Sequence, residues 1–215
     1  MKSLSTLILA LVVVVLISQP AMALSFTGSL SSPSGITASP GTPWDGTISL
    51  TWIVTQNIDM SWDYQYRFSY PSKDISHFIV AISPNATAND FWGANGSPIT
   101  IATYDPSNPG NPGLPSAFYG LKLDYEGNYF TFTSTKAPVW GDFYIKDGKF
   151  DGNDVYAYNS SFGSPDPTDA PRDGTINNKI LRPDSVTTTI PEPSSMILFG
   201  SVLAFAGGIR RFRRK

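Results

Sequence analysis

The sequence predicts an all-β protein, an antiparallel β-sandwich of jelly-roll type, and two observations carry that prediction. Several segments alternate apolar and polar residues with a period of two, the pattern of strands buried on one face. Between its two ends, the 215-residue chain is rich in Thr, Ser, Gly, Pro and aromatic residues and poor in Leu, which favours strands and turns over helices. Long apolar runs occur only at the two ends, where we expect a signal helix and a transmembrane helix.

The clearest alternation covers two neighbouring segments, 47–55 and 60–70. In both, large apolar or aromatic side chains occupy every second position, and residues 56–59 between them predict a hairpin turn. The segment 75–83 is apolar on both faces and is expected to be buried. Turns are expected at 125–127 and at Asp147-Gly148. Together the runs predict eight or nine strands, the others being 24–30, 99–104, 118–124, 128–134, 138–146 and 155–158.

The rest of the chain divides into loops and a predicted stalk. Residues 84–98 and 105–115 are long loops, and the second, with four prolines, is expected to run over the surface. From Asn159 to Ile190 the apolar periodicity fades among prolines and polar residues, which predicts an extended stalk, 159–190, after a folded domain, 24–158. The alternative is that residues 176–186 add a last edge strand.

The N-terminus has the three parts of a secretory signal peptide. Lys2 supplies a positive charge, residues 7–17 are continuously apolar, and Ala21-Met22-Ala23 is a small-x-small cleavage site. We therefore expect residues 1–23 to be removed after Ala23, with Ala21 and Ala23 as the recognised positions. An uncleaved N-terminal anchor is the alternative.

The C-terminus combines a short rigid motif, an apolar run and a basic end. Pro191-Glu192-Pro193 precedes residues 196–209, which carry no charge. Counted from Ser194 the run would form a helix of about 24 Å, near the lower limit for the roughly 30 Å bilayer core. The cations after it should hold the C-terminus in the cytoplasm. The sequence thus predicts a transmembrane helix rather than the alternative, a buried core helix, with a basic end at Arg210, Arg211, Arg213, Arg214 and Lys215.

This tail, over about residues 190–215, resembles the PEP-CTERM sorting domain in its tripeptide, its apolar helix and its basic terminus, and a signal peptide precedes it. The resemblance implies recognition of Pro191, Glu192 and Pro193 by an exosortase, a polytopic membrane transpeptidase. It further implies a transient stay in the inner membrane, then delivery to the outer surface or exopolysaccharide matrix of a Gram-negative bacterium. Residues 137–148 also resemble a stretch common in such cargo proteins, which suggests a shared head domain and implies no known activity.

Charge and cysteine content exclude several classes of function. Residues 24–190 hold nine Lys or Arg and sixteen Asp or Glu, so the exported body has a net charge near −7. This acidity argues against nucleic acid as a partner. The chain has no cysteine, which excludes disulfides, zinc–thiolate sites and a cysteine nucleophile.

Candidate catalytic groups are few. The single histidine, His77, lies beside Ile75 and Ile79 in an apolar strand pattern, so we expect it to be structural. No serine sits in a nucleophile elbow, and one histidine is too few for a typical zinc site. The sequence cannot pair two carboxylates for glycoside hydrolysis. We therefore expect no enzyme activity, no catalytic residue and no cofactor, although carboxylates are present at Asp63, Asp124, Glu126 and Asp142.

The acidic segment 147–154 is superficially similar to a calcium loop. Lys149 occupies a ligand position of the EF-hand pattern, and Tyr158 stands where its closing Glu belongs. Two Asp-Gly turns are the expected structure, and no metal site is predicted. A calcium site of another kind is the alternative.

Two of the five tryptophans, Trp44 and Trp92, lie in loop-like segments next to Asp45 and Asp90. Exposed aromatic rings beside carboxylates can stack on sugar rings, so both are candidate ligand-binding residues. Packing that anchors the loops is the alternative. The sequence as a whole predicts a non-enzymatic surface or matrix protein sorted by an exosortase. The alternative function is a carbohydrate-binding β-sandwich module associated with exopolysaccharide.

Overall fold

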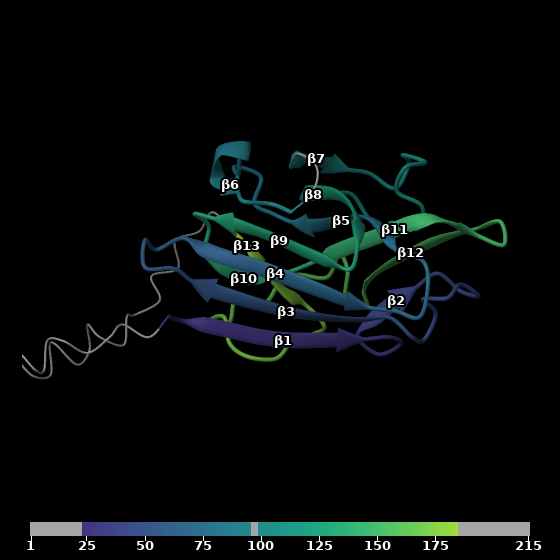
Figure 1. Cartoon of the computed structure of the whole chain (residues 1–215), viewed down its shortest axis with the longest axis horizontal. Helices are drawn as coiled ribbons and strands as arrows, with labels where there is room; N and C mark the ends of the chain where they lie inside the picture. The colour runs from purple at the N-terminus through teal and green to yellow at the C-terminus, as the bar shows by residue number, and fades with distance from the viewer. Residues whose placement is uncertain (1–22, 96–98, 185–215) are drawn as a thin grey trace, which may run out of the picture. The chain divides into compact units, whose positions relative to one another are not determined.

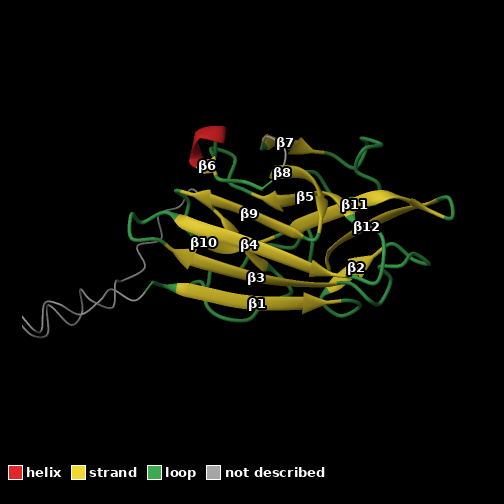
Figure 2. Cartoon of the chain, viewed as in Figure 1, coloured by secondary structure: helices red, strands yellow, loops and turns green. Residues whose placement is uncertain are grey.

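The computed structural model describes residues 23–95 and 99–184, and the regular secondary structure in this part of the chain is almost entirely β-strand (Figures 1 and 2). The predicted transmembrane helix, the basic end and all of the predicted signal peptide except Ala23 lie outside the described residues. The one helical segment described is the 3-10 turn η1 (Ala88–Asp90). No helix within the described ranges is long and apolar enough to span a bilayer.

Five strands form the first antiparallel sheet. The predicted hairpin is confirmed, because the two long strands pair along their length with Trp52 opposite Tyr66. Met60, with a φ of 68°, lies in the turn that joins them. The order across the sheet is β1 (Ser25–Ser31), β3 (Ser49–Gln56), β4 (Trp62–Ser69), β9 (Tyr129–Ser134) and β6 (Phe91–Trp92).

Six strands form the second antiparallel sheet. The tight turn expected at 125–127 is wrong, because these residues belong to the strand β8 (Phe118–Gly127), after which the chain passes through Asn128 into β9 of the first sheet. The order is β2 (Ile36–Ala38), β12 (Asn153–Asn159), β11 (Phe143–Phe150), β5 (Ile75–Ala81), β8 (Phe118–Gly127) and β7 (Thr100–Tyr104).

The segment that the sequence predicts as one continuous strand, 138–146, forms parts of two strands, and one of them belongs to a third, two-stranded sheet. Residues 138–146 form β10 (Pro138–Gly141) and the start of β11, which belong to different sheets and meet at Asp142. The partner of β10 is β13 (Ile180–Pro183), with Trp140 opposite Leu181. Asp142 is therefore the point where the chain changes sheet.

Aromatic rings join the inner faces of the two large sheets. The Tyr66 and Phe78 centroids are 4.9 Å apart, and those of Phe78 and Phe130 are 5.2 Å apart. Each pair links a strand of the five-stranded sheet to β5, so the sheets pack face to face around an aromatic core. The all-β, antiparallel prediction is confirmed. The jelly-roll strand order stays a prediction. The pairs β3–β4 and β11–β12 are hairpins, and each lies within one sheet.

The stalk prediction is wrong for residues 159–184, which pack on the folded domain. The backbone N–H of Thr27, on the edge strand β1, donates to Asp173 Oδ1 at 2.8 Å. The Tyr66 hydroxyl donates to the Leu181 carbonyl at 2.8 Å, and the side chains of Ile180 and Leu181 are fully buried. The domain thus continues past residue 158, and the alternative of a last strand within 176–186 is correct. Two apolar residues among prolines gave too short a pattern to reveal it.

The outer face of the six-stranded sheet is covered. We call it the covered face: Ile79, Tyr104 and Tyr144 from the sheet, with Leu114 packed over them from the loop 105–115. The Tyr144 hydroxyl donates to the Pro112 carbonyl at 2.7 Å and fixes this loop in place. The expected surface path of this loop is confirmed for residues 105–110, which are exposed, whereas Asn111 and Leu114 pack onto the sheet.

Candidate functional site

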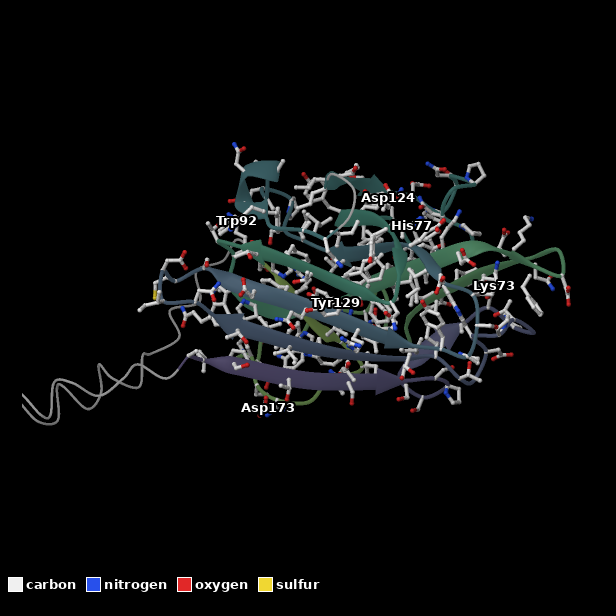
Figure 3. All side chains as sticks on the ribbon, viewed as in Figure 1. Lys73, His77, Trp92, Asp124, Tyr129 and Asp173 are labelled. Atoms are coloured by element: carbon white, nitrogen blue, oxygen red, sulfur yellow. The ribbon has the colours of Figure 1, made fainter. Side chains whose placement is uncertain are left out.

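Within residues 23–95 and 99–184, no loop packs over the outer face of the five-stranded sheet in this way. Its side chains alternate with the buried aromatic residues of β3, β4 and β9, and they are exposed or half-buried. Figure 3 labels the two aromatic members, Tyr129 and Trp92. We call this surface the open face, and its residues are Thr51, Ile53, Asp63, Gln65, Arg67, Trp92, Tyr129, Thr131 and Thr133.

A groove of about 150 Å³ crosses the open face, lined by Thr51, Ile53, Gln65, Arg67 and Tyr129. The Tyr129 hydroxyl donates to Gln65 Oε1 at 2.9 Å. The Arg67 guanidinium lies 5.1 Å from the centroid of the Tyr129 ring, a cation–π contact. Ring, amide and guanidinium are thereby held in one arrangement in the free protein.

A second group on the open face surrounds Trp92. Asp63 Oδ1 accepts hydrogen bonds from Thr133 Oγ1 at 2.8 Å and from Asn57 Nδ2 at 3.0 Å. Trp92 pairs with Thr133 across β6 and β9 and is 42 % exposed. Thr133 lies four residues along β9 from Tyr129, so the two aromatic positions are roughly 14 Å apart. The open face therefore offers two aromatic contacts with polar side chains between them.

The structure separates the two predicted ligand-binding tryptophans. Trp92 is exposed at the edge of the open face, but Trp44 is fully buried. The Trp44 Nε1–H donates to the Lys73 carbonyl at 3.1 Å, and its ring lies 6.0 Å from that of Tyr70. The prediction for Trp44 is wrong, because the turn that carries it folds inward and its ring anchors the loop.

Tyr129, Gln65 and Arg67 were not predicted as site residues. A signal for them existed, since Gln65 and Arg67 occupy the polar positions of the best alternating strand in the chain. That alternation showed which side of β4 faces away from the core. It could not show that β9 would bring the ring of Tyr129 to the same side.

His77 lies on the other sheet, beside the covered face. It is 6 % exposed, its ring lies 6.2 Å from that of Tyr144, and its Nε2 has no hydrogen-bond partner among the described residues. Burial first, and then the charges of Lys122 and Lys146, lower the pKa of His77 to about 3 against the opposing effect of Asp124. The imidazole is therefore neutral at neutral pH. Its environment is that of a packed side chain.

The candidate carboxylates have different surroundings. Asp63 belongs to the open face, whereas Asp142 is buried beside Lys179. Asp124, on β8, forms an ion pair with Lys122 at 2.7 Å. Asp63 lies on β4, Asp124 on β8, and Asp142 between β10 and β11, so these carboxylates belong to different parts of the fold.

The acidic segment 147–154 is part of a β-hairpin. The turn lies at Asp151-Gly152, both with positive φ, while Asp147-Gly148 lies within β11 at an irregularity in its pairing. One of the two predicted Asp-Gly turns is therefore confirmed and the other is wrong. Asp147 forms an ion pair with Lys73 at 3.0 Å. In the described part of the chain, no three His, Cys, Asp or Glu residues gather closely enough to hold a metal ion.

Comparison with known proteins identifies the tail. Residues 189–214 match the family model of the PEP-CTERM protein-sorting motif. No curated protein and no solved structure matches the chain. The match spans the expected tripeptide Pro191-Glu192-Pro193 and four of the five terminal cations, which lie outside the described residues. The chain therefore carries a PEP-CTERM sorting motif, which indicates an exported protein that an exosortase processes.

Proposed function

We propose that this protein is a non-enzymatic component of the outer surface or exopolysaccharide matrix, and that its open face binds polysaccharide. The observation that supports binding is the groove in which Tyr129, Gln65 and Arg67 hold one another in place on an uncovered sheet. Sugar rings combine apolar C–H faces with many hydroxyls. A fixed aromatic ring beside amide and guanidinium donors complements both.

The spacing on the open face favours an oligosaccharide over a single sugar. Tyr129 and Trp92 are separated by roughly 14 Å, with Thr131 between them on β9. A chain of several sugar units can contact both rings and the polar side chains between them. The arrangement is fixed in the free protein, which lowers the ordering cost of binding.

The charge on the open face favours an acidic polysaccharide. The exported body is acidic, yet Arg67 has no carboxylate partner within residues 23–95 and 99–184. An exposed guanidinium that is stacked on a ring and not paired with an acid is suited to a carboxylate or sulfate group of a ligand.

Delivery follows from the two targeting segments. In the proposed route, residues 1–23 direct export and the apolar run 196–209 holds the protein in the inner membrane. An exosortase then cuts at or near residues 191–194 and leaves the helix behind. Proline restricts its own φ and the residue before it, so the sequence Pro191-Glu192-Pro193 is expected to favour an extended backbone, the shape that a protease cleft accepts.

The binding proposal is tested on the exported, mature protein with a glycan array, followed by calorimetric titration of an oligosaccharide that binds. We expect Tyr129→Ala and Trp92→Ala each to weaken binding about tenfold or more. Tyr125→Ala is the matched control, because Tyr125 is an exposed aromatic residue on the six-stranded sheet, and it should leave affinity unchanged. Equal affinity in all three variants would place binding elsewhere, and release of new reducing ends from the bound glycan would show an enzyme.

The sorting proposal is tested separately in the native host. Replacing Pro191-Glu192-Pro193 with alanines should keep the full-length protein in the inner membrane. Deleting residues 194–215 should release a soluble periplasmic protein instead. Mass spectrometry of the surface or matrix fraction decides the outcome: a mature protein there that still contains residues 210–215 would show that the tail is a plain anchor.

A further inference from the structure

A cluster of charged side chains is buried where the chain changes sheet. Lys179, just before β13, is fully buried, and its Nζ lies 2.7 Å from Asp142 Oδ1 and 3.1 Å from Asp166 Oδ1. Lys179 Nζ also donates to the Ser164 carbonyl at 2.7 Å. The amine thus has three oxygen partners, two of them carboxylates, and no exposed surface.

The Asp142 carboxyl group is held at both oxygens. Asn159 Nδ2 donates to Oδ1 at 2.7 Å, and the backbone N–H of Gly163 donates to Oδ2 at 3.1 Å. Asn159 is itself fully buried and fixed, because its Oδ1 accepts the backbone N–H of Phe143 at 3.0 Å. Two oriented donors therefore point at the carboxyl group that the amine contacts.

Asp166 links the cluster to its edge. Its Oδ1 contacts Lys179, and its Oδ2 accepts from Arg182 Nη2 at 2.9 Å. The side chain of Asp166 is 34 % exposed, whereas that of Lys179 is inaccessible. Asp166 is thus a carboxylate in contact with both the buried amine and the solvent.

We propose that Lys179 and Asp142 form an intramolecular isopeptide bond, an amide between Nζ and Cγ, without help from another protein. The two groups are adjacent, immobile and shielded from water. Such fixed proximity gives a very high effective concentration of amine and carboxyl group. The reaction also replaces a buried ion pair, whose desolvation is costly, by a neutral amide.

The atoms balance without a co-reactant. Nζ gives a proton to Asp166, and its lone pair attacks Cγ of Asp142 to form the new N–C bond. The tetrahedral oxyanion is stabilised by the donors Asn159 Nδ2 and Gly163 N–H. One Cγ–O bond of Asp142 then breaks. Asp166 transfers two protons from the ammonium group to the departing oxygen, which leaves as water. An ammonium and a carboxylate become an amide and water, with no change of oxidation state.

The bond would link the last described strand covalently to the point where the chain changes sheet. Asp142 joins β10 to β11, and Lys179 immediately precedes β13. The chain has no cysteine, so this exported fold contains no disulfide. An isopeptide bond supplies a covalent closure that needs no oxidant.

The test is the intact mass of the exported, mature protein after denaturation. We expect a mass lower than that of the unlinked chain by one water molecule. Trypsin should then yield a branched peptide in which residues 137–146 are joined to the peptide that contains Lys179, with no cleavage after Lys179. An intact mass equal to that of the unlinked chain, with tryptic cleavage after an unmodified Lys179, would overturn the proposal.

Variants separate this bond from other losses of water. A succinimide at an Asp-Gly step also removes one water, and the chain has such steps at Asp45, Asp147, Asp151 and Asp173. Lys179→Arg keeps the charge but cannot form the amide, so this variant should have the mass calculated for its unlinked chain, with no loss of water. Persistence of the loss in Lys179→Arg would assign it to a succinimide and contradict the proposal. Asp166→Asn should abolish or slow the linkage although both partners remain.

A matched control uses an exposed pair at the same distance. Lys122 Nζ lies 2.7 Å from Asp124 Oδ1, but both side chains are partly in water. Lys122→Arg should leave the loss of one water unchanged. A branched peptide through Lys122 instead of Lys179 would show that burial is not the cause and would overturn the assignment.

Discussion

The open face and the covered face are the outer surfaces of two sheets that share one aromatic core, and they differ in what lies on them. On the covered face, the loop 105–115 packs Leu114 against Ile79 and Tyr144. On the open face, the Tyr129 ring and the Arg67 guanidinium contact each other at the surface, and none of the described segments packs over them. The six-stranded sheet therefore packs side chains on both of its sides, whereas the five-stranded sheet leaves the polar side of β3, β4 and β9 exposed or half-buried.

The cause of this difference is visible in single strands. In β4 the aromatic residues all point to one side, so its other side can remain polar. In β5 nearly every residue is buried, including His77 and Ile79 on the side away from the shared core. A strand that is apolar on both sides needs a cover on both, and the proline-rich loop supplies the second one.

The largest expected effect comes from removing the cover of the covered face. Leu114→Ala should lower the free energy of unfolding by about 2–4 kcal/mol, because it leaves a cavity in a packed cluster. Ile53→Ala is the matched change on the open face, where the side chain is 44 % exposed, and it should cost less than about 1 kcal/mol. Denaturant unfolding of both variants measures the contrast, and equal losses would show that the loop is not a structural layer.

A pH dependence carried by His77 is the next effect in size. Its pKa is about 3 in the folded protein and near 6.5 when unfolded, so below pH 6.5 the unfolded chain binds a proton that the folded protein does not. Stability is fully present above pH 6.5 and falls by about 1.4 kcal/mol per pH unit as the pH drops toward 3.

This prediction is measured by comparing wild type with His77→Gln at pH 7.5 and pH 5. Between these values the wild type should lose about 2 kcal/mol more than the variant, since His77 is the only histidine in the chain. Parallel pH profiles would mean that the imidazole is solvated in the native state and that the covered face is open at this point.

The smallest effect on stability is expected at the centre of the open face. Gln65→Ala removes the acceptor of the Tyr129 hydroxyl, but water can replace it, so unfolding should change by less than about 0.5 kcal/mol. The same variant should weaken oligosaccharide binding, because the ring of Tyr129 loses one of its two constraints. A large loss of stability together with unchanged binding would reverse the roles assigned to the two faces.

The sequence predicted the parts of the fold that depend on neighbours along the chain. Alternation located β3 and β4 and the turn between them, because a strand with one buried face has a period of two. It could not locate β13, since Ile180 and Leu181 are a run of only two apolar residues and their burial depends on β10, about 40 residues earlier.

Contacts between distant segments also explain why one of the two predicted ligand-binding tryptophans is buried and the other is exposed. Trp44 lies in a loop-like sequence, but its place in the core is set by Lys73 and Tyr70, which no local pattern joins to it. Trp92 has a similar sequence context and is exposed, because it continues the sheet beyond β9. Composition predicted that such rings exist, and long-range pairing determined which one faces solvent.

The position of β13 determines how the fold bears mechanical load. It is the last described strand before the sorting motif, and β10 is its only strand partner in the part of the chain that the structure describes. Tension applied through the chain beyond Asp184 first separates Pro183 from Pro138 and reaches the pair of Ile180 and Gly141 last. The two strands therefore separate one residue pair at a time from the C-terminal end. The ion pairs of Lys179 with Asp142 and Asp166 lie beyond the last pair, so they come under load only after β13 has left β10.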